Sequence, residues 1–340
     1  MSPYKPQTKQ QYSQSRPKPI PAQYKSRVNP MLAQEGKRED INQPKYEEQR
    51  KFDGTRIMVI KDGDKVVIRG ARNWINDYAP KYPEMVEEVR QLPVERCILD
   101  GEMTFFKKGT DRDVFVTALA NPETKRDLGV EAKAMLFDVL YVDDDSLQHL
   151  PFKDRDDILR TLVPKGLKHI EVVKTVTRDK EKFFEDLKAK QGEGVVLKEA
   201  ESPYRQGVRS PEWLKLKHWR SDEAIVVGYT QGKGARASTF GALILAQKDP
   251  KTGKLRYIGK ASGLKEAEMR SILKKMNGLK AQKSPLAEVP PDADAKTWVQ
   301  PKIVVEVKYY ERTPYGLLRF PDFLRERMDK KPSECTLKTT

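Results

Sequence analysis

Hydrophobic and polar positions are arranged differently in the two halves of this 340-residue chain. In the first half, short apolar runs predict strands over 56–60, 65–69, 97–106 and 134–142. Apolar residues at helical spacing predict helices over 84–92, 154–163 and 179–191. The run 134–142 is mostly apolar, so we expect a central strand that is buried on both faces.

The pattern changes after Arg220, where strand signals follow one another closely. Strands are predicted over 224–229, 239–247 and 256–260, a helix over 265–276 and, after a Pro-rich linker at 284–295, strands over 303–310 and 317–323. Three strands, a helix and two strands are the element order of a five-stranded OB barrel, a common nucleic-acid platform. We therefore predict an α+β chain whose second domain, residues 221–340, is an OB-fold β-barrel.

Residues 1–28 differ from both halves. They contain six Lys or Arg and no acidic residue, are otherwise rich in Pro, Gln, Ser and Tyr, and show no apolar periodicity. Such a segment cannot bury enough surface to fold alone. We predict a disordered basic tail, and the first folded domain then covers residues 29–220.

The formal net charge of +15 is the strongest bulk feature. It favours a polyanionic partner, because neutralising phosphates releases condensed counterions; a charge that serves only solubility or attraction to a membrane surface is the alternative. No apolar run approaches the roughly 20 residues of a membrane span, and no apolar signal segment begins the chain. Cys97 and Cys335 lack metal-ligand spacing. We expect an intracellular, cytoplasmic protein from a bacterium, an archaeon or a virus.

The segment 51–56 carries the first candidate chemistry, with the pattern K-x-D-G-x-R. A lysine attacks phosphorus only as the free amine, so Lys51 needs a lowered pKa, which neighbouring cations and partial desolvation supply. Arg56 would hold a phosphate during that attack. Because Asp-Gly is a common turn dipeptide, an ordinary charged turn is the alternative.

Two further segments extend this chemistry. In 192–198, the carboxylate of Glu193 lies between two glycines at the start of a short strand. In 213–217, an extended chain would put Lys215 and Lys217 on one face and two leucines on the other. Paired cations backed by leucines would bind an anion, whereas an ordinary half-buried strand with a solvated face is the alternative.

Taken in order, these segments resemble the motifs of ATP-dependent DNA ligases, which belong to the covalent nucleotidyltransferase superfamily. Residues 51–56 resemble motif I, 71–73 the S-R-N element, 99–102 motif III, 136–138 motif IIIa, 193–198 motif IV, 213–217 motif V and 318–330 motif VI. Six ordered motifs are far more specific than any one of them. The resemblance implies that residues 29–220 form an adenylation (nucleotidyltransferase) domain of antiparallel sheets with helices.

The second domain resembles one subgroup of this family. Residues 232–234, 239–243 and 257–260 are similar to the ligase module of bacterial end-joining ligases. The large N-terminal DNA-binding domain of replicative ligases does not fit into the 28 residues before Asn29. We therefore expect a compact, monomeric, two-domain ligase acting on nicked duplex DNA, without an indication of pathway (replication, repair or recombination) or of end preference.

The resemblance implies a reaction in three steps. Lys51 attacks the α-phosphate of ATP, releases pyrophosphate and retains AMP. The AMP passes to the 5′-phosphate at a nick, and the 3′-hydroxyl then displaces it. Every step handles charge at phosphorus, which is consistent with many cations and carboxylates in the motifs.

Residue roles are implied in the same way. Phe137 stacks on adenine, and Glu102 holds the ribose hydroxyl. Contacts to phosphate or ribose are implied for Arg56, Arg72, Arg209 and Lys215. Lys217 stabilises the α-phosphate together with Lys215.

The remaining roles concern the metal and the later steps. Glu193 and Glu102 would hold Mg²⁺, with Mn²⁺ as an alternative, because hard cations prefer carboxylate and phosphate oxygens. Asp53 would serve the later steps. From the OB domain, residues of motif VI would orient pyrophosphate through a lid-like closure, namely Arg319, Asp329 and Lys330.

The sequence departs from the family pattern at two positions. Gln49 stands where a glutamate usually precedes the lysine, and its amide offers donors as well as an acceptor to adenine. Glu48 would take this role if the local register differed. Trp74 replaces a glycine after Arg72-Asn73, so we expect a wider turn there or a ring that stacks on a base.

Two other functions remain open from the sequence. An RNA ligase or a capping-type guanylyltransferase uses the same lysine chemistry, and Gln49 keeps this alternative open. A non-catalytic OB-type nucleic-acid-binding protein would not need the catalytic set, yet Lys51, Glu102, Glu193, Lys215 and Lys217 are all present.

Overall fold

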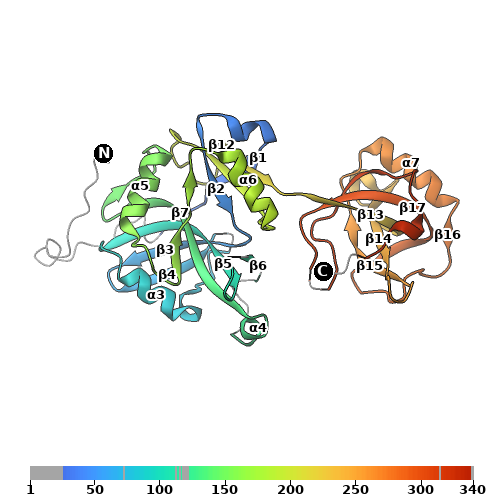
Figure 1. Cartoon of the computed structure of the whole chain (residues 1–340), viewed down its shortest axis with the longest axis horizontal. Helices are drawn as coiled ribbons and strands as arrows, with labels where there is room; N and C mark the ends of the chain where they lie inside the picture. Colours follow the sequence, from blue (N-terminus) through green and yellow to red (C-terminus); the bar gives the residue numbers. More distant parts are fainter. Residues whose placement is uncertain are drawn as a thin grey trace, which may run out of the picture. The chain divides into compact units, whose positions relative to one another are not determined.

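The computed structural model describes residues 26–71, 73–111, 113–114, 116, 122–313 and 315–337. These form two compact units that divide between His218 and Trp219 (Figure 1). The division falls two residues before Arg220, where the sequence pattern changes. Most of the predicted basic tail, residues 1–25, lies outside the described residues.

The first unit contains two sheets. The five-stranded sheet has the order β1 (Leu32–Glu35), β12 (Arg209–Lys217), β11 (Gly194–Glu199), β2 (Tyr46–Lys51) and β10 (Thr175–Val176). The seven-stranded sheet has the order β4 (Lys65–Gly70), β3 (Gly54–Asp62), β5 (Arg96–Lys107), β7 (Val130–Val142) and β8 (Asp145–Ser146), with β6 (Asp113–Val114) beside β5 and β9 (Ile170–Val172) beside β7. Pairing is antiparallel except between β1 and β12 and between β7 and β9.

Apolar clusters hold these sheets together. One lies between them and includes Met58, Leu140 and Trp213. Another covers the far face of the seven-stranded sheet, where α3 (Pro83–Arg90) contributes Met85 and Val89. The third joins the five-stranded sheet to α6 (Lys180–Ala189). As predicted, β7 is central and almost wholly buried.

The other helices and short helical turns lie between the strands. They are η1 (Arg38–Asn42), η2 (Ala79–Lys81), α4 (Pro122–Asp127) and α5 (Phe152–Leu162) in the first unit, and η3 (Gly234–Arg236), α7 (Glu266–Asn277) and η4 (Pro332–Glu334) in the second. The three helices predicted for the first half correspond to α3, α5 and α6. Among the residues that the structure describes, none of the helices has the length and apolar character to cross a bilayer.

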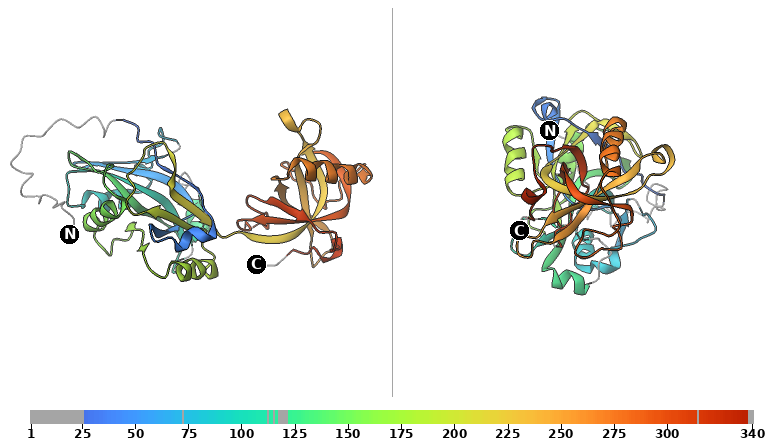
Figure 2. Two further views of the ribbon diagram at one scale, coloured as in Figure 1. Left: turned by 90° about the horizontal axis from the view of Figure 1, so that it is seen from above. Right: turned by 90° about the vertical axis from the view of Figure 1, so that its right-hand side faces the viewer.

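The second unit is a barrel (Figure 2). Its strands are β13 (Arg220–Gln231), β14 (Phe240–Lys248), β15 (Leu255–Ala261), β16 (Lys280–Ala281), β17 (Ala295–Tyr309) and β18 (Asp322–Glu326). The ladder runs β15-β14-β13-β17, and β18 pairs with β17. A parallel bridge between Ser262 and Asp322 closes the ring, with the Phe323 amide donating to the Ser262 carbonyl at 2.8 Å. The ring order β13-β14-β15-β18-β17 is the predicted OB-fold topology.

One strand was not predicted, and the bounds of two others were wrong. The charged segment Tyr46–Lys51 is a strand, β2, which the sequence pattern did not predict. The strand predicted over 317–323 begins at Asp322, because Phe320 has a positive φ of 51° that interrupts the extended chain. β17 starts at Ala295, well before residue 303, and continues through the whole apolar run.

Candidate active site

Lys51 is the last residue of β2, at the point where the chain leaves the five-stranded sheet. Phe52 and Asp53 then connect it to β3 in the seven-stranded sheet. The Lys51 side chain is 23% exposed, so its amine is accessible without being fully solvated. The strand bounds therefore place Lys51 where the chain passes from one sheet to the other.

The register also determines which side chains accompany Lys51. Gly194 lies opposite both Lys51 and Lys217, and Val196 lies opposite both Gln49 and Lys215. Residues paired across antiparallel strands project from the same face. Gln49, Lys51, Lys215 and Lys217 therefore share one face, while Leu214 and Leu216 pack toward α6 on the other. The alternation predicted for 213–217 is present.

The Glu193 carboxylate contacts both Lys51 and Lys217. Its Oε2 accepts from Lys51 Nζ at 2.5 Å, and its Oε1 lies 3.2 Å from Lys217 Nζ. The carboxylate is almost completely buried, and burial raises the pKa of Glu193 although the Lys51 ammonium opposes this shift. A buried carboxylate of raised pKa beside an amine is suited to accept a proton from it. Lys215 pairs instead with Glu35 at 3.0 Å.

Arg56 lies on β3, opposite Glu102 of β5. Its guanidinium donates two hydrogen bonds to Asp100, at 3.0 and 2.6 Å, and lies 5.3 Å from the centre of the Phe137 ring. Tyr204 donates to the same Asp100 at 2.7 Å, which fixes the pair further. Burial raises the pKa of Glu102 to about 8, against the attraction of Lys51 and Arg56.

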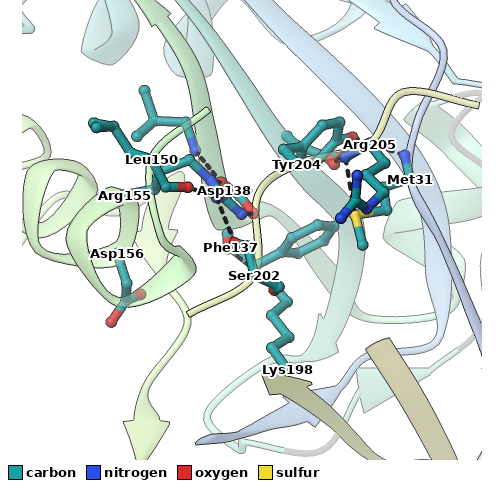
Figure 3. A network of polar contacts seen from close by, with 12 residues as sticks. Met31, Phe137, Asp138, Leu150, Arg155, Asp156, Lys198, Ser202, Tyr204 and Arg205 are labelled. Atoms are coloured by element: carbon teal, nitrogen blue, oxygen red, sulfur yellow. Dashed lines mark hydrogen bonds and ion pairs between the residues drawn. The ribbon is translucent and has the colours of Figure 1, made fainter. Parts of the chain in front are cut away.

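Phe137 lies at the centre of a polar network on β7 (Figure 3). The fully buried pair of Arg155 and Asp138 lies on one side of it, joined by hydrogen bonds of 2.8 and 3.1 Å. On the other side, the Met31 amide donates to Tyr204 Oη. The ring itself is only partly buried and meets Trp213 edge to face at 6.4 Å. Arg56 and Lys198 also lie over this ring, at 5.3 and 4.6 Å from its centre.

Lys198 is a residue whose position the sequence analysis did not single out. Its amine donates to the Phe137 carbonyl at 2.8 Å and lies 4.2 Å from the centre of the Trp213 ring. The residue is 2% exposed, and burial lowers the pKa of Lys198 to about 8. Two-residue alternation along the strand could have identified Lys198, because it puts Lys198 on the same face of β11 as Val196, which lies opposite Gln49.

The orientation of the Gln49 amide is set by the protein. Its Nε2 donates to Thr175 Oγ1 at 2.9 Å and lies 3.5 Å from Asp156 Oδ1. Arg160 donates to both of these partners, at 2.9 Å to Thr175 and 2.8 Å to Asp156. Since the amide nitrogen is directed at these acceptors, the carbonyl oxygen is the group presented to a ligand.

Glu48 cannot take this role, because strand alternation turns it to the opposite face of β2, opposite Leu197. It is completely buried, and neither carboxylate oxygen has a hydrogen-bond partner among the described residues. Burial raises the pKa of Glu48 to about 8, partly offset by Lys180. The alternative register considered from the sequence is therefore wrong.

The remaining residues predicted for the site in the first unit are Arg72, Arg209, Asp53 and Trp74. Arg72 is outside the described residues. Arg209, at the start of β12, is exposed and donates to the Ala33 carbonyl at 2.6 Å. The Asp53 amide donates to Asp113 Oδ2 at 3.1 Å. Trp74 packs against the cluster of Met58 and Trp213, so its ring belongs to the core between the sheets.

The motif VI residues belong to the second unit. Arg319 pairs with Glu311 at 2.5 Å, Asp329 with Arg327 at 2.8 Å, and Lys330 with Glu334 at 3.4 Å. The roles inferred for Arg319, Asp329 and Lys330 from the resemblance remain predictions.

The carboxylates of the site do not form a complete metal centre. In the part of the chain that the structure describes, no group of three or more His, Cys, Asp or Glu side chains is placed to hold a metal ion. Glu193 is buried and Glu102 is partly buried, and the negative charge of Glu193 adds to the rise in the pKa of Glu102. Two such carboxylates fit a hard divalent cation when a phosphate supplies further oxygen ligands.

Comparisons with known protein families cover nearly the whole folded chain. Residues 30–217 match the ATP dependent DNA ligase domain, and residues 236–330 match the ATP dependent DNA ligase C terminal region. The chain is 31% identical over 309 residues to the multifunctional non-homologous end joining DNA repair protein LigD of Mycobacterium tuberculosis, covering 90% of this chain and 39% of that protein. It is 29% identical over 303 residues to a DNA ligase of Thermococcus onnurineus, covering 84% of this chain and 52% of that protein.

The chain thus spans only about two-fifths to one-half of these relatives' lengths. Among solved structures, one from a structure–function study of Lig E DNA ligases, described as binding DNA with a minimal scaffold, superposes with a TM-score of 0.55 at 22% identity. That comparison covers 88% of this chain and 99% of the other. This structural similarity supports the fold assigned to the chain.

Proposed function

Because this chain belongs to the family of ATP-dependent DNA ligases, we propose that it seals nicks in duplex DNA that carry a 5′-phosphate and a 3′-hydroxyl. The observation that carries the proposal is the placement of Lys51, Lys215 and Lys217 on one face, with Glu193 joining two of them. This arrangement combines a nucleophile, a proton acceptor and cations for phosphate charge.

In the first step, the Lys51 amine attacks the α-phosphorus of ATP. The new N–P bond replaces the bond to pyrophosphate, which departs, and the amine proton passes to Glu193 at 2.5 Å. Lys217 and Lys215 offset the charge that develops on the phosphate oxygens. Arg72 and Arg209 are assigned further contacts to phosphate or ribose.

The nucleoside would be held between the two sheets. Phe137 stacks on adenine, Glu102 accepts from the ribose hydroxyl, and Gln49 accepts from the adenine 6-amino group through its carbonyl oxygen. Arg56 is aligned by Asp100 beside the Phe137 ring. Guanine carries an oxygen where adenine carries the amino group, so Gln49 in this orientation favours ATP over GTP.

Glu193 and Glu102 would hold Mg²⁺, or Mn²⁺ in its place, together with phosphate oxygens. When bound, the metal supplies positive charge to the phosphate. In the later steps the AMP moves to the 5′-phosphate of the nick, where Asp53 is assigned a role, and the 3′-hydroxyl displaces it. Each transfer exchanges one bond to phosphorus for another.

The test is covalent labelling of the full chain with Mg²⁺ and ATP or GTP labelled at the α-phosphate. We expect an acid-stable adduct from ATP that is absent in Lys51→Ala and retained in Lys45→Ala, a surface lysine just before β2. Label from GTP alone would indicate a capping-type enzyme. No adduct from either nucleotide would indicate a binding protein.

Sealing assays then identify the nucleic acid. Nicked DNA and nicked RNA duplexes of the same sequence are compared, and we expect sealing of DNA. Preferential sealing of RNA would replace the proposal by an RNA ligase.

A further inference from the structure

We propose that Asp113 is a positioning residue for Lys51, holding the chain on both sides of the nucleophile with one carboxylate. The inference rests on the proposed function, in which Lys51 attacks ATP. Asp113 belongs to the short strand β6, which pairs with β5 opposite Phe106. It is separated from Lys51 by some sixty residues in sequence and contacts both of its flanks.

The two oxygens of Asp113 have different partners. Oδ1 accepts from Arg50 Nη2 at 2.6 Å, and Arg50 directly precedes Lys51. Oδ2 accepts from the backbone amide of Asp53 at 3.1 Å, two residues after Lys51. The Asp113 side chain is only 4% exposed and that of Arg50 14%, so water screens this ion pair weakly.

The two-residue link that Asp113 contacts lies outside both strand ladders. Lys51 ends β2 in one sheet, Gly54 begins β3 in the other, and Phe52 and Asp53 belong to neither strand. Ladder hydrogen bonds therefore fix the chain before and after the link, while the link itself depends on contacts made by side chains. A free link of two residues would allow the preceding Lys51 to shift relative to the α-phosphate.

The neighbours of Asp113 reinforce the same anchor. Arg50 also donates to the Asp111 carbonyl at 3.0 Å, and its guanidinium lies 4.7 Å from the centre of the Phe52 ring. That ring meets Phe106 of β5 edge to face at 5.9 Å. Asp53 and Arg50 thus contact Asp113 of β6, and Phe52 contacts Phe106 of β5.

Asp113 acts through these groups and not on the nucleotide. Arg50 lies opposite Val195, so alternation along β2 places it on the face away from Lys51, Gln49 and Lys217. Asp113 therefore holds Arg50 on the face of β2 opposite to Lys51, and fixes the backbone that carries Lys51 without contacting the nucleotide. Its loss should slow the attack while leaving nucleotide binding largely intact.

The experiment compares wild-type protein with Asp113→Ala and Asp113→Asn in single-turnover labelling with ATP. We expect the rate at saturating ATP to fall by roughly 10- to 100-fold in Asp113→Ala, because small displacements of reacting groups cost this much. The ATP concentration for half-maximal rate should change by less than about threefold. Asp113→Asn should recover part of the rate, since its amide oxygen can still accept from the Asp53 amide.

Two controls separate positioning from general damage. Glu131→Gln alters an exposed carboxylate on β7, which lies opposite Phe106 on the other side of β5, and its rate should match wild type. Binding of an ATP analogue with a methylene between the α- and β-phosphates, which cannot transfer AMP, should be equal in wild type and Asp113→Ala. Weaker analogue binding in proportion to the lost rate would overturn the inference, because it indicates a damaged pocket.

If wild type is labelled by ATP and Asp113→Ala is labelled at the same rate, the inference about Asp113 is overturned. The proposed function would remain intact. Absence of labelling in the wild type would instead overturn the proposed function, and the role of Asp113 would fall with it.

Discussion

Glu48 shows how a single buried carboxyl group couples stability to pH. Its pKa is about 8 in the folded protein and near 4.5 when unfolded, so between these values only the folded state keeps the proton. Stability therefore falls as pH rises through this window. The charged groups near it are Lys180 and Arg38, which oppose the rise in its pKa, and Glu181, which adds to it.

Glu48→Gln removes this dependence, because glutamine resembles the protonated acid and cannot ionise. At pH 8.5 we expect the variant to be more stable than wild type by about 2 kcal/mol, the order of cost of an uncompensated buried polar group. At pH 4 the two should unfold alike. Thermal unfolding between pH 4 and 9 measures this, with the exposed Glu39→Gln as control. A constant difference across the range would contradict the assignment.

A second residue-scale prediction concerns the choice of nucleotide. Thr175→Val removes the hydroxyl that accepts from the Gln49 amide, so the amide is free to turn its nitrogen toward the base. We expect the preference for ATP over GTP to fall by about 3- to 10-fold, within the range of a lost polar contact. The ratio of kcat/KM for adduct formation from the two nucleotides measures it.

Thr161→Val provides the matched control, because the Thr161 hydroxyl donates only to the Asp157 carbonyl on α5. Its nucleotide preference should equal that of wild type. If Thr175→Val also left the preference unchanged, Gln49 would not be held in the orientation described.

At the scale of elements, strands with an apolar signal were predicted and the strand that carries the nucleophile was not. β7 and β5 have long apolar runs, whereas β2 reads Y-E-E-Q-R-K. Its polar side chains are accommodated because one face lies beside the polar residues Lys215 and Lys217, and the charges on the other face are compensated by Lys180 and Asp113. A search for alternating apolar residues does not detect a strand whose side chains are mostly polar.

The candidate site was predictable to the extent that it follows from local spacing. Two-residue alternation was sufficient to place Lys215 and Lys217 on one face. The partners of Gln49 and of the residues beside Lys51 were not predictable, since Thr175 and Asp113 are 126 and 60 residues from Gln49 and Asp53. Such contacts depend on the path of the chain between two sheets, which no single segment encodes.

Gly54 gives a prediction about two elements. A Cβ atom at this position would lie 2.2 Å from the Met103 carbonyl oxygen, so β3 and β5 would have to separate. We expect Gly54→Ala to destabilise the first unit by about 2–4 kcal/mol, as backbone overpacking does. Thermal unfolding and ATP labelling should both be impaired. Gly278→Ala, where the nearest atom would be at 3.6 Å, should behave as wild type.

For the whole molecule, the net charge of +15 predicts binding to DNA that weakens steeply with salt. In the second unit, Lys233 and Arg236 are exposed on the loop after β13. Replacing both by Gln should weaken binding to nicked DNA more at low salt than at high salt. The slope of log K against log salt should become shallower by up to about 2 if both contact phosphates.

The charge-conserving pair Lys233→Arg with Arg236→Lys is the control and should keep the wild-type slope. An equal loss of affinity at every salt concentration in the Gln variant would contradict an electrostatic role for this loop.

The position of Glu193 between two amines has a consequence for the full reaction cycle. In the proposed reaction Lys51 would carry AMP, and its nitrogen would then be an uncharged phosphoramide that does not pair with a carboxylate as an ammonium does. Glu193 then keeps Lys217 as its cationic neighbour, and Oε2 becomes available to a different donor. The proposed adenylated and free forms would therefore differ by one positive charge beside the buried Glu193 carboxylate, so the hydrogen-bond partners of Glu193 would depend on whether Lys51 is modified.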